Sequence, residues 1–202
     1  MIHIVNYGMG NTGSIKNMIK RLGYNSTITS DPKELKEARK IILPGVGAFD
    51  PAIKRIEELG LREILNECVL ERKIPVLGIC LGMQLITLGS EEGKLPGLGW
   101  IDAYAKKFPK DKVHKVPHMG WNNVSPSSRS PLTRDISNDC RFYFVHSYHV
   151  LAQRKEDSIL KCMHGIEFDA AISKDNVFGV QFHPEKSHRY GKNLLNNFID
   201  LC

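Results

Sequence analysis

The sequence predicts an α/β fold, in which an open, mainly parallel sheet has helices on both faces and the second half of the chain adds further β structure. Two patterns support this prediction. Short apolar runs alternate with helical periodicities over residues 1–88, as expected for parallel strands covered by helices. Residues 100–180 contain short β-like runs separated by turns instead.

The first strand and the first helix have clear boundary signals. Residues 2–7 are apolar and rich in β-branched side chains, which favours a strand. Asn11-Thr12 then precedes a helical periodicity over residues 12–22, and Gly23 ends it. Residues 24–29 predict a second short strand.

Two Asp-Pro pairs predict the starts of further helices, because Asp is a favoured N-cap and proline fits the first helical position. Asp31-Pro32 opens a helix that we expect to end near Arg39. Asp50-Pro51 opens a helical region that continues, through further apolar spacing, to about Arg72. Between the two pairs, residues 40–43 predict a third strand.

A fourth strand-like run leads into Gly78-Ile79-Cys80-Leu81-Gly82, and a helix-like run follows to Leu88. This is the pattern of a nucleophile elbow, a sharp strand-to-helix turn that exposes a nucleophile above the sheet. The flanking glycines leave room for the strained turn. The positive end of the following helix favours a thiolate. The pattern therefore predicts Cys80 as a nucleophile.

The base that such a nucleophile needs lies in residues 179–185, where a strand-like run ends at His183 and Glu185 follows two positions later. The carboxylate can accept a hydrogen bond from one ring nitrogen and fix the tautomer. Ligands bind at the carboxyl ends of strands in open α/β sheets, and both Cys80 and His183 follow strands. We therefore predict a triad of Cys80, His183 and Glu185. The two histidines of segment 146–149 remain alternative bases of lower rank.

Three further segments have both a functional and a structural interpretation. Pro44-Gly45-Val46-Gly47 follows a strand and presents backbone N–H groups for an oxyanion hole, or is simply a tight turn. Gln84 lies one helical turn after Cys80 and either contacts a substrate or is polar on an exposed turn. Residues 117–122 suit an interface if exposed, but composition alone favours burial of Trp121.

Composition narrows the remaining function classes. The net charge is +6, yet basic and acidic residues are interspersed, which argues against nucleic-acid binding and favours at most a local basic patch. No run reaches the ~20 apolar residues of a membrane span, and no signal peptide is evident, so we expect a cytoplasmic protein without membrane contact.

Neither the cysteines nor the histidines have metal-binding spacing. The five cysteines form no CxxC pair, so we predict no disulfide framework, no metal site and no cofactor. Residues 6–11 lack the GxGxxG pattern of nucleotide binding. No linker or repeat divides the chain, and we expect a single domain over residues 1–202.

Seven segments together resemble the triad glutamine amidotransferases and, within that family, the glutaminase subunits of imidazole glycerol phosphate synthases. The elbow and the His-Pro-Glu segment specify the broad class, whereas residues 8–11 and 117–122 specify the subunit. The resemblance implies a flavodoxin-like fold. The matching segments are residues 6–11, 43–49, 78–84, 90–93, 115–122, 144–148 and 179–187.

The resemblance implies hydrolysis of L-glutamine through a thioester on Cys80, with His183 as proton carrier. It implies an oxyanion hole from the N–H groups of Gly47 and Leu81. It further implies a heterodimer with a (β/α)8-barrel synthase subunit of histidine biosynthesis, which receives ammonia through a tunnel. The implied substrate-binding residues are Gly45, Gln84, Ser147 and Tyr148, and the implied interface residues are Asn11, Met119, Trp121 and Lys186.

Four alternatives stay open at this stage. His164-Gly165 and the tryptophan of Gly97-Leu98-Gly99-Trp100 depart from the family pattern, which leaves room for a paralogue that supplies ammonia to another synthase, such as one amidating a surface sugar. A stand-alone cysteine hydrolase would need no partner. A pseudoenzyme is disfavoured by the intact triad. A nucleic-acid binder would show steep salt dependence.

Overall fold

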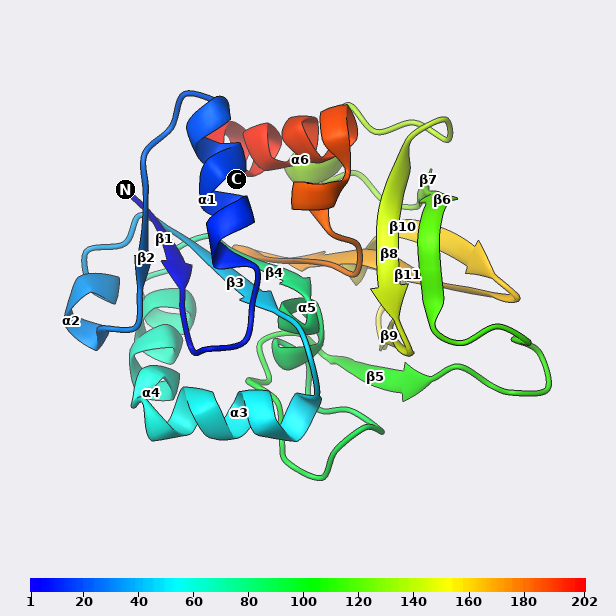
Figure 1. Cartoon of the computed structure of the whole chain (residues 1–202), viewed down its shortest axis with the longest axis horizontal. Coiled ribbons are helices and arrows are strands. Elements are labelled where there is room, and N and C mark those ends of the chain that lie inside the picture. The colour runs from blue at the N-terminus through cyan, green and yellow to red at the C-terminus, as the bar shows by residue number, and fades with distance from the viewer.

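Five parallel strands form the centre of the structure, a computed structural model that describes residues 1–202 (Figure 1). They lie within a ten-stranded sheet, and their spatial order is that of a doubly wound α/β fold, which confirms the predicted fold class. In that order the strands are β2 (Ser26–Thr29), β1 (Ile2–Val5), β3 (Lys40–Gly45), β4 (Val76–Cys80) and β12 (Val177–Val180).

Helices cover both faces of these strands (Figure 1). One face packs against α1 (Thr12–Arg21) and α6 (His188–Leu201), whose apolar stripes join a buried cluster with the sheet. The other face packs against a second buried cluster, to which the remaining helices contribute. These are α2 (Pro32–Leu35), α3 (Phe49–Glu58), α4 (Leu61–Asn66) with its π-helical extension Glu67–Glu71, and α5 (Leu81–Leu85).

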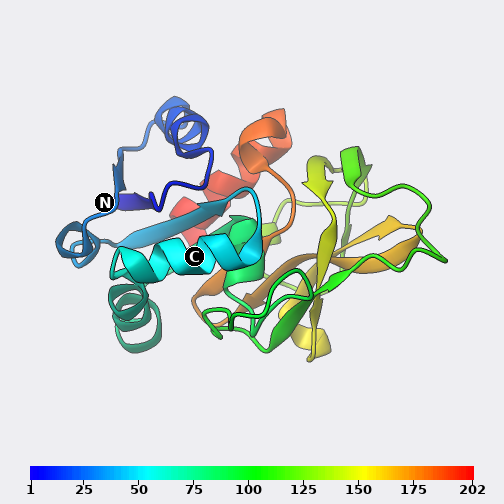
Figure 2. The same cartoon turned by 60° about the horizontal axis from the view of Figure 1, so that its bottom comes forward.

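The second half of the chain adds antiparallel strands that extend to one side of the helical half (Figure 2). β12 pairs with β11 (Ile166–Lys174), followed by β10 (Ser158–His164) and β7 (Ser125–Pro126). β9 (Tyr148–Ala152) joins β11 to β5 (Ala103–Lys107). A separate two-stranded sheet contains β6 (His118–Asn123) and β8 (Arg141–His146). Short 3-10 turns cover Pro131–Thr133, Lys155–Asp157 and Pro184–Lys186.

The two Asp-Pro signals have different outcomes. Asp31 caps α2 as predicted, accepting a hydrogen bond from Lys33 N at 2.8 Å, but that helix ends at Leu35 and not near Arg39. The predicted cap at Asp50 is wrong, because α3 begins at Phe49, one residue before it. The long helix expected after Asp50 is interrupted at Gly60, whose φ of +63° breaks the helical path.

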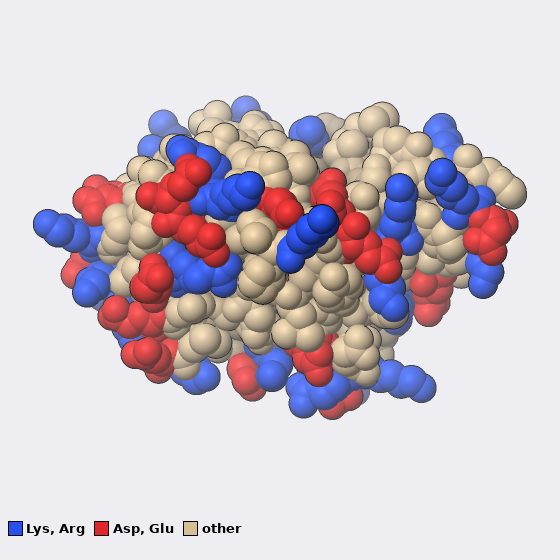
Figure 3. Space-filling view, turned by 90° about the horizontal axis from the view of Figure 1, so that it is seen from below, with Lys and Arg blue, Asp and Glu red and all other residues tan.

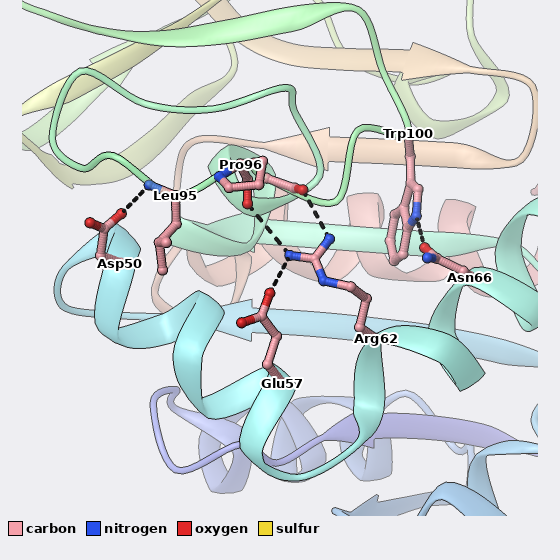
Figure 4. A network of polar contacts seen from close by, with 8 residues as sticks. Asp50, Glu57, Arg62, Asn66, Leu95, Pro96 and Trp100 are labelled. Atoms are coloured by element: carbon pink, nitrogen blue, oxygen red, sulfur yellow. Dashed lines mark hydrogen bonds and ion pairs between the residues drawn. The ribbon is translucent and has the colours of Figure 1, made fainter.

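A strap over residues 90–100 is tied to α3 and α4 by polar contacts (Figure 4). The Asp50 carboxylate accepts hydrogen bonds from the backbone N–H groups of Lys94 and Leu95. Arg62 donates to the carbonyl of Gly97 at 3.1 Å. The Trp100 indole, 4% exposed, donates to Asn66 Oδ1 at 2.8 Å. Trp100, where the family pattern suggested a smaller residue, is therefore a packing residue of this strap.

The expected burial of Trp121 on compositional grounds is wrong, since its exposed fraction is 42% and that of Met119 is 56%. Both lie on β6, a strand that the sequence did not predict, and the alternation of side chains along it turns His118 inward and these two residues outward.

The charged surface and the helix lengths bear on two function classes, nucleic-acid binding and membrane insertion. On the face shown in Figure 3, acidic and basic side chains are interspersed, so the net charge of +6 is not gathered into one basic patch there. None of the helices combines the length and the apolar character that crossing a bilayer requires.

Candidate active site

Cys80 lies on a strained turn between β4 and α5, as the glycine pattern predicts. Its φ is +55° and its ψ is −108°, a backbone conformation that L-residues rarely adopt. Only glycine fits two positions before it and two positions after it. A Cβ on Gly82 would lie 1.8 Å from the carbonyl oxygen of Leu43, and one on Gly78 would lie 2.6 Å from the carbonyl oxygen of Gly82. The turn is therefore held by close packing of backbone against backbone.

The neighbouring strand β12 brings His183 to the same edge of the sheet. β12 pairs in parallel with β4, with Val180 opposite Ile79, so both chains leave the sheet side by side. His183 Nδ1 donates to Glu185 Oε1 at 2.9 Å, and the two side chains are only 2% and 1% exposed. The structure thus brings Cys80, His183 and Glu185 together.

The surroundings of His183 favour its charged form. Burial lowers the pKa of the imidazole, but the interactions with Cys80 and Glu185 outweigh that effect and raise the pKa to about 10. The Nε2 atom has no hydrogen-bond partner within the protein. Its interaction with Cys80 therefore lies outside hydrogen-bond geometry, although both side chains line the same cavity.

A cavity of about 320 Å³ opens above Cys80, within the size range of small-molecule sites. Gly45 is the one predicted substrate-binding residue that does not line it, because it ends β3 with Tyr7 and Leu81 closely packed around it. The lining residues are Val46, Gly47, Cys80, Leu81, Gln84, Glu92, Pro117, Val145, His146, Ser147, Tyr148 and His183.

The glycine-rich turn after β3 borders this cavity. Gly47 has a φ of +97°, in the region that favours glycine. The Tyr7 hydroxyl donates to the carbonyl of Pro44 at 2.7 Å and anchors the start of the turn. Leu81, the first residue of α5, directly follows Cys80 and also lines the cavity. The two predicted oxyanion residues therefore border one site.

The two alternative bases, His146 and His149, make other contacts. His146 Nδ1 donates to the carbonyl of Tyr148 at 2.7 Å, and its Nε2 accepts from His118 Nδ1 at 2.9 Å. Burial lowers the pKa of His146 to about 3 and that of His118 to about 4. The His149 ring stacks on Phe108 at 4.7 Å, and burial lowers its pKa as well. None of these rings pairs with Cys80.

Two polar residues of the site were missed by sequence reasoning. Glu92 reaches the cavity from the strap, and its Oε2 accepts a hydrogen bond from the backbone N–H of Phe49 at 2.9 Å. Burial raises the pKa of the Glu92 carboxyl. Gln181 is fully buried beside Cys80. Its only sequence signal is a polar residue two positions before His183 at the end of an apolar strand.

Three of the four predicted interface residues gather near one surface. Trp121 stacks on His188 with ring centroids 5.5 Å apart, and it packs edge-on against Tyr143. Lys186 Nζ lies over the same Tyr143 ring at 5.7 Å. Met119 is exposed two residues before Trp121 on β6. The fourth residue, Asn11, precedes α1, which packs against the 3-10 turn that contains Lys186.

Comparison with known proteins places this geometry in a family. A sequence model of the family Glutamine amidotransferase class-I matches residues 3–201. The chain is 52% identical over 199 residues to imidazole glycerol phosphate synthase subunit HisH 2 of Methanococcus maripaludis, covering 98% of both chains. It is 47% identical to the subunit HisH 2 of Pseudomonas aeruginosa and 47% to the subunit HisH of Bdellovibrio bacteriovorus, in both cases covering 100% of each chain.

Solved structures agree on the fold. A crystal structure of a glutamine amidotransferase matches with a TM-score of 0.75 at 17% identity, covering 99% of this chain and 97% of that one. The structure of PurLQS from Thermotoga maritima matches with a TM-score of 0.74 at 18% identity, covering 98% and 97%. With the elbow, the His-Glu pair and the full-length relatives together, this chain belongs to the class-I glutamine amidotransferases and, within them, to the imidazole glycerol phosphate synthase subunits HisH.

Proposed function

We propose that this chain hydrolyses L-glutamine on Cys80 and delivers the ammonia to a synthase subunit that makes imidazole glycerol phosphate in histidine biosynthesis. The observation that carries the proposal is the strained Cys80 turn beside the buried His183–Glu185 pair. The names of the full-length relatives support the assignment to this synthase.

The proposed reaction proceeds in two steps. The Cys80 thiolate attacks the side-chain carboxamide carbon of glutamine, and the N–H groups of Gly47 and Leu81 bind the oxyanion. The His183 imidazolium protonates the nitrogen, the C–N bond breaks and ammonia departs. The glutamyl group then remains on Cys80 as a thioester. Neutral His183 then deprotonates a water that attacks the thioester, which releases glutamate and returns the proton to the imidazole. Glu185 holds the ring in one tautomer throughout.

The rest of the cavity suits the amino-acid end of glutamine. We assign the substrate ammonium to Glu92, whose Oε2 is occupied by Phe49 N–H while its second oxygen has no partner within the protein. Ser147 and Tyr148 border the same cavity and supply polar groups for the substrate carboxylate. Gln84 lies between them and the nucleophile, donating to the carbonyl of Tyr148 at 3.3 Å.

The partner in this proposal is a (β/α)8-barrel subunit that receives ammonia through a tunnel at the interface. The exposed aromatic and basic surface around Trp121 and Lys186 supports this docking position, since exposed tryptophans are common anchors of interfaces. We further propose that residues 1–202 act as one glutaminase domain, in line with the family match over residues 3–201.

The test is glutamate release from glutamine, measured for the chain alone and with the barrel subunit of imidazole glycerol phosphate synthase plus its nucleotide ligand. Strong stimulation by the partner supports the whole proposal. Activity that the partner leaves unchanged retains the chemistry and reassigns the ammonia acceptor. Cys80→Ala is the chemical control: it should abolish glutamate release while the partner still binds, and turnover near that of the wild type would reject Cys80 as nucleophile.

A further inference from the structure

Gln181 joins the nucleophile to the substrate-facing part of the cavity. Its side chain is 0% exposed, just beyond the end of β12. The Nε2 atom donates to Cys80 Sγ at 3.8 Å, and Oε1 accepts from Gln84 Nε2 at 3.3 Å. A buried amide costs free energy unless its oxygen and its nitrogen are both hydrogen-bonded, so these two contacts account for the position of the side chain.

The direction of this chain of hydrogen bonds is set at both ends by groups that only accept. Gln84 also donates to the carbonyl of Tyr148, which has no proton to give. A thiolate at Cys80 likewise only accepts. The amide nitrogen of Gln181 must therefore face the sulfur, and its oxygen must face Gln84, since a reversed amide would bring an oxygen lone pair against the thiolate.

The thiol and the thiolate of Cys80 need different neighbours. As a thiol, Sγ donates to the carbonyl of Val145 at 3.8 Å. When the proton has left, that carbonyl is an unfavourable neighbour and the sulfur needs donors instead. In the proposed reaction the His183 imidazolium is one donor, although its Nε2 makes no hydrogen bond to the sulfur in the structure. Gln181 supplies a second donor that is neutral and keeps its protons in every step.

We propose that Gln181 is a catalytic hydrogen-bond donor that stabilises the Cys80 thiolate and fixes its position relative to Gln84. This inference rests on the proposed function, because it takes Cys80 as the nucleophile. A purely structural role for Gln181 predicts a lower unfolding temperature without any change in the acidity of the thiol. The two roles are therefore separable by experiment.

The test is the pH dependence of alkylation of Cys80 by iodoacetamide in the full chain, followed by mass spectrometry on the peptide that contains Cys80. Alkylation requires neither glutamine nor the partner. Gln181→Met removes the donor at similar side-chain length, and we expect the midpoint of the alkylation curve to move up by about one pH unit, a tenfold loss of thiolate at a given pH. Gln153→Met is the matched control at an exposed position and should leave the midpoint unchanged.

Gln181→Glu is the second variant, in case Gln181→Met folds poorly. It keeps an acceptor for Gln84 but places a carboxylate against the sulfur, so its midpoint should rise further than that of Gln181→Met. An unchanged midpoint in a folded variant, or a smaller rise for Gln181→Glu than for Gln181→Met, overturns the inference and leaves the proposed function standing. The proposed function fails separately if Cys80→Ala still releases glutamate.

Discussion

Replacing Gly82 with alanine tests whether close backbone packing builds the reactive turn. The new Cβ would lie 1.8 Å from the carbonyl oxygen of Leu43, far inside the distance at which carbon and oxygen can approach. The oxygen belongs to the backbone and a Cβ cannot rotate away from its own backbone, so no side-chain rotation relieves the contact. α5 must move away from β3 by more than an ångström, and Cys80, at the start of α5, must move with it.

The magnitude follows from the same contact. Overpacking a well-packed site costs about 1–3 kcal/mol, and an overlap of a Cβ with a backbone oxygen belongs at the upper end of that range. A misplacement of ~1 Å at a catalytic group can cost about a hundredfold in rate. We therefore expect Gly82→Ala to lose about 3 kcal/mol of unfolding free energy and about a hundredfold in partner-stimulated glutaminase activity.

Urea unfolding and the glutamate-release assay measure the two effects. Gly13→Ala is the matched control: Gly13 lies in α1, a Cβ there meets nothing within 4 Å, and alanine should stabilise the helix by about 0.5–1 kcal/mol. If Gly82→Ala unfolds and turns over like the wild type, close packing at Gly82 does not build the turn at Cys80.

Three further predictions concern the triad, the interface and pH. Glu185→Gln should lower turnover less than His183→Ala, since orienting the ring matters less than carrying the proton; equal or reversed losses in steady-state kinetics would overturn these roles. Trp121→Ala should weaken partner association by more than ~1 kcal/mol in a titration while leaving the unfolding midpoint unchanged, because the ring is 42% exposed; a lowered midpoint with normal association would indicate a core role. His118 and His146 have pKa values lowered by burial from 6.5 to about 4 and about 3, so the unfolded chain binds more protons between those values and 6.5. The stability that the neutral forms of these two histidines contribute is fully present above pH 6.5. It is lost as the pH falls toward 3, and the loss in unfolding free energy is about 3 kcal/mol for His118 alone. A urea midpoint that stays constant from pH 6.5 to 4 would refute this; the raised pKa of His183 acts in the opposite sense, with stability lost above pH 6.5.

Local patterns in the sequence were sufficient for the framework of the site. The glycines around Cys80, the spacing of His183 and Glu185, and the alternation of strands and helices all depend on residues close together in the chain, where steric and hydrogen-bonding preferences act directly. These features predicted the α/β class, the strained turn and the orienting carboxylate. The geometry agrees with each of them.

Features that depend on distant residues were decided only by the tertiary structure. Strand order brings β12 beside β4 and so joins His183 to Cys80. Asp50 looked like a helix cap, but the strap over residues 90–100 offers its carboxylate two backbone N–H groups instead. That strap also carries Glu92 into the cavity.

Burial and exposure likewise follow from the tertiary structure. Composition favoured a buried Trp121, but it lies on a two-stranded sheet with one face to the core and points outward. Gln181 is the opposite case, a polar side chain that is buried because Cys80 and Gln84 satisfy its amide. The sequence by itself thus determined the strained turn at Cys80 and the pairing of His183 with Glu185. Packing between segments far apart in the chain decided their neighbours, because the free energy of burial and hydrogen bonding depends on partners that no local pattern names.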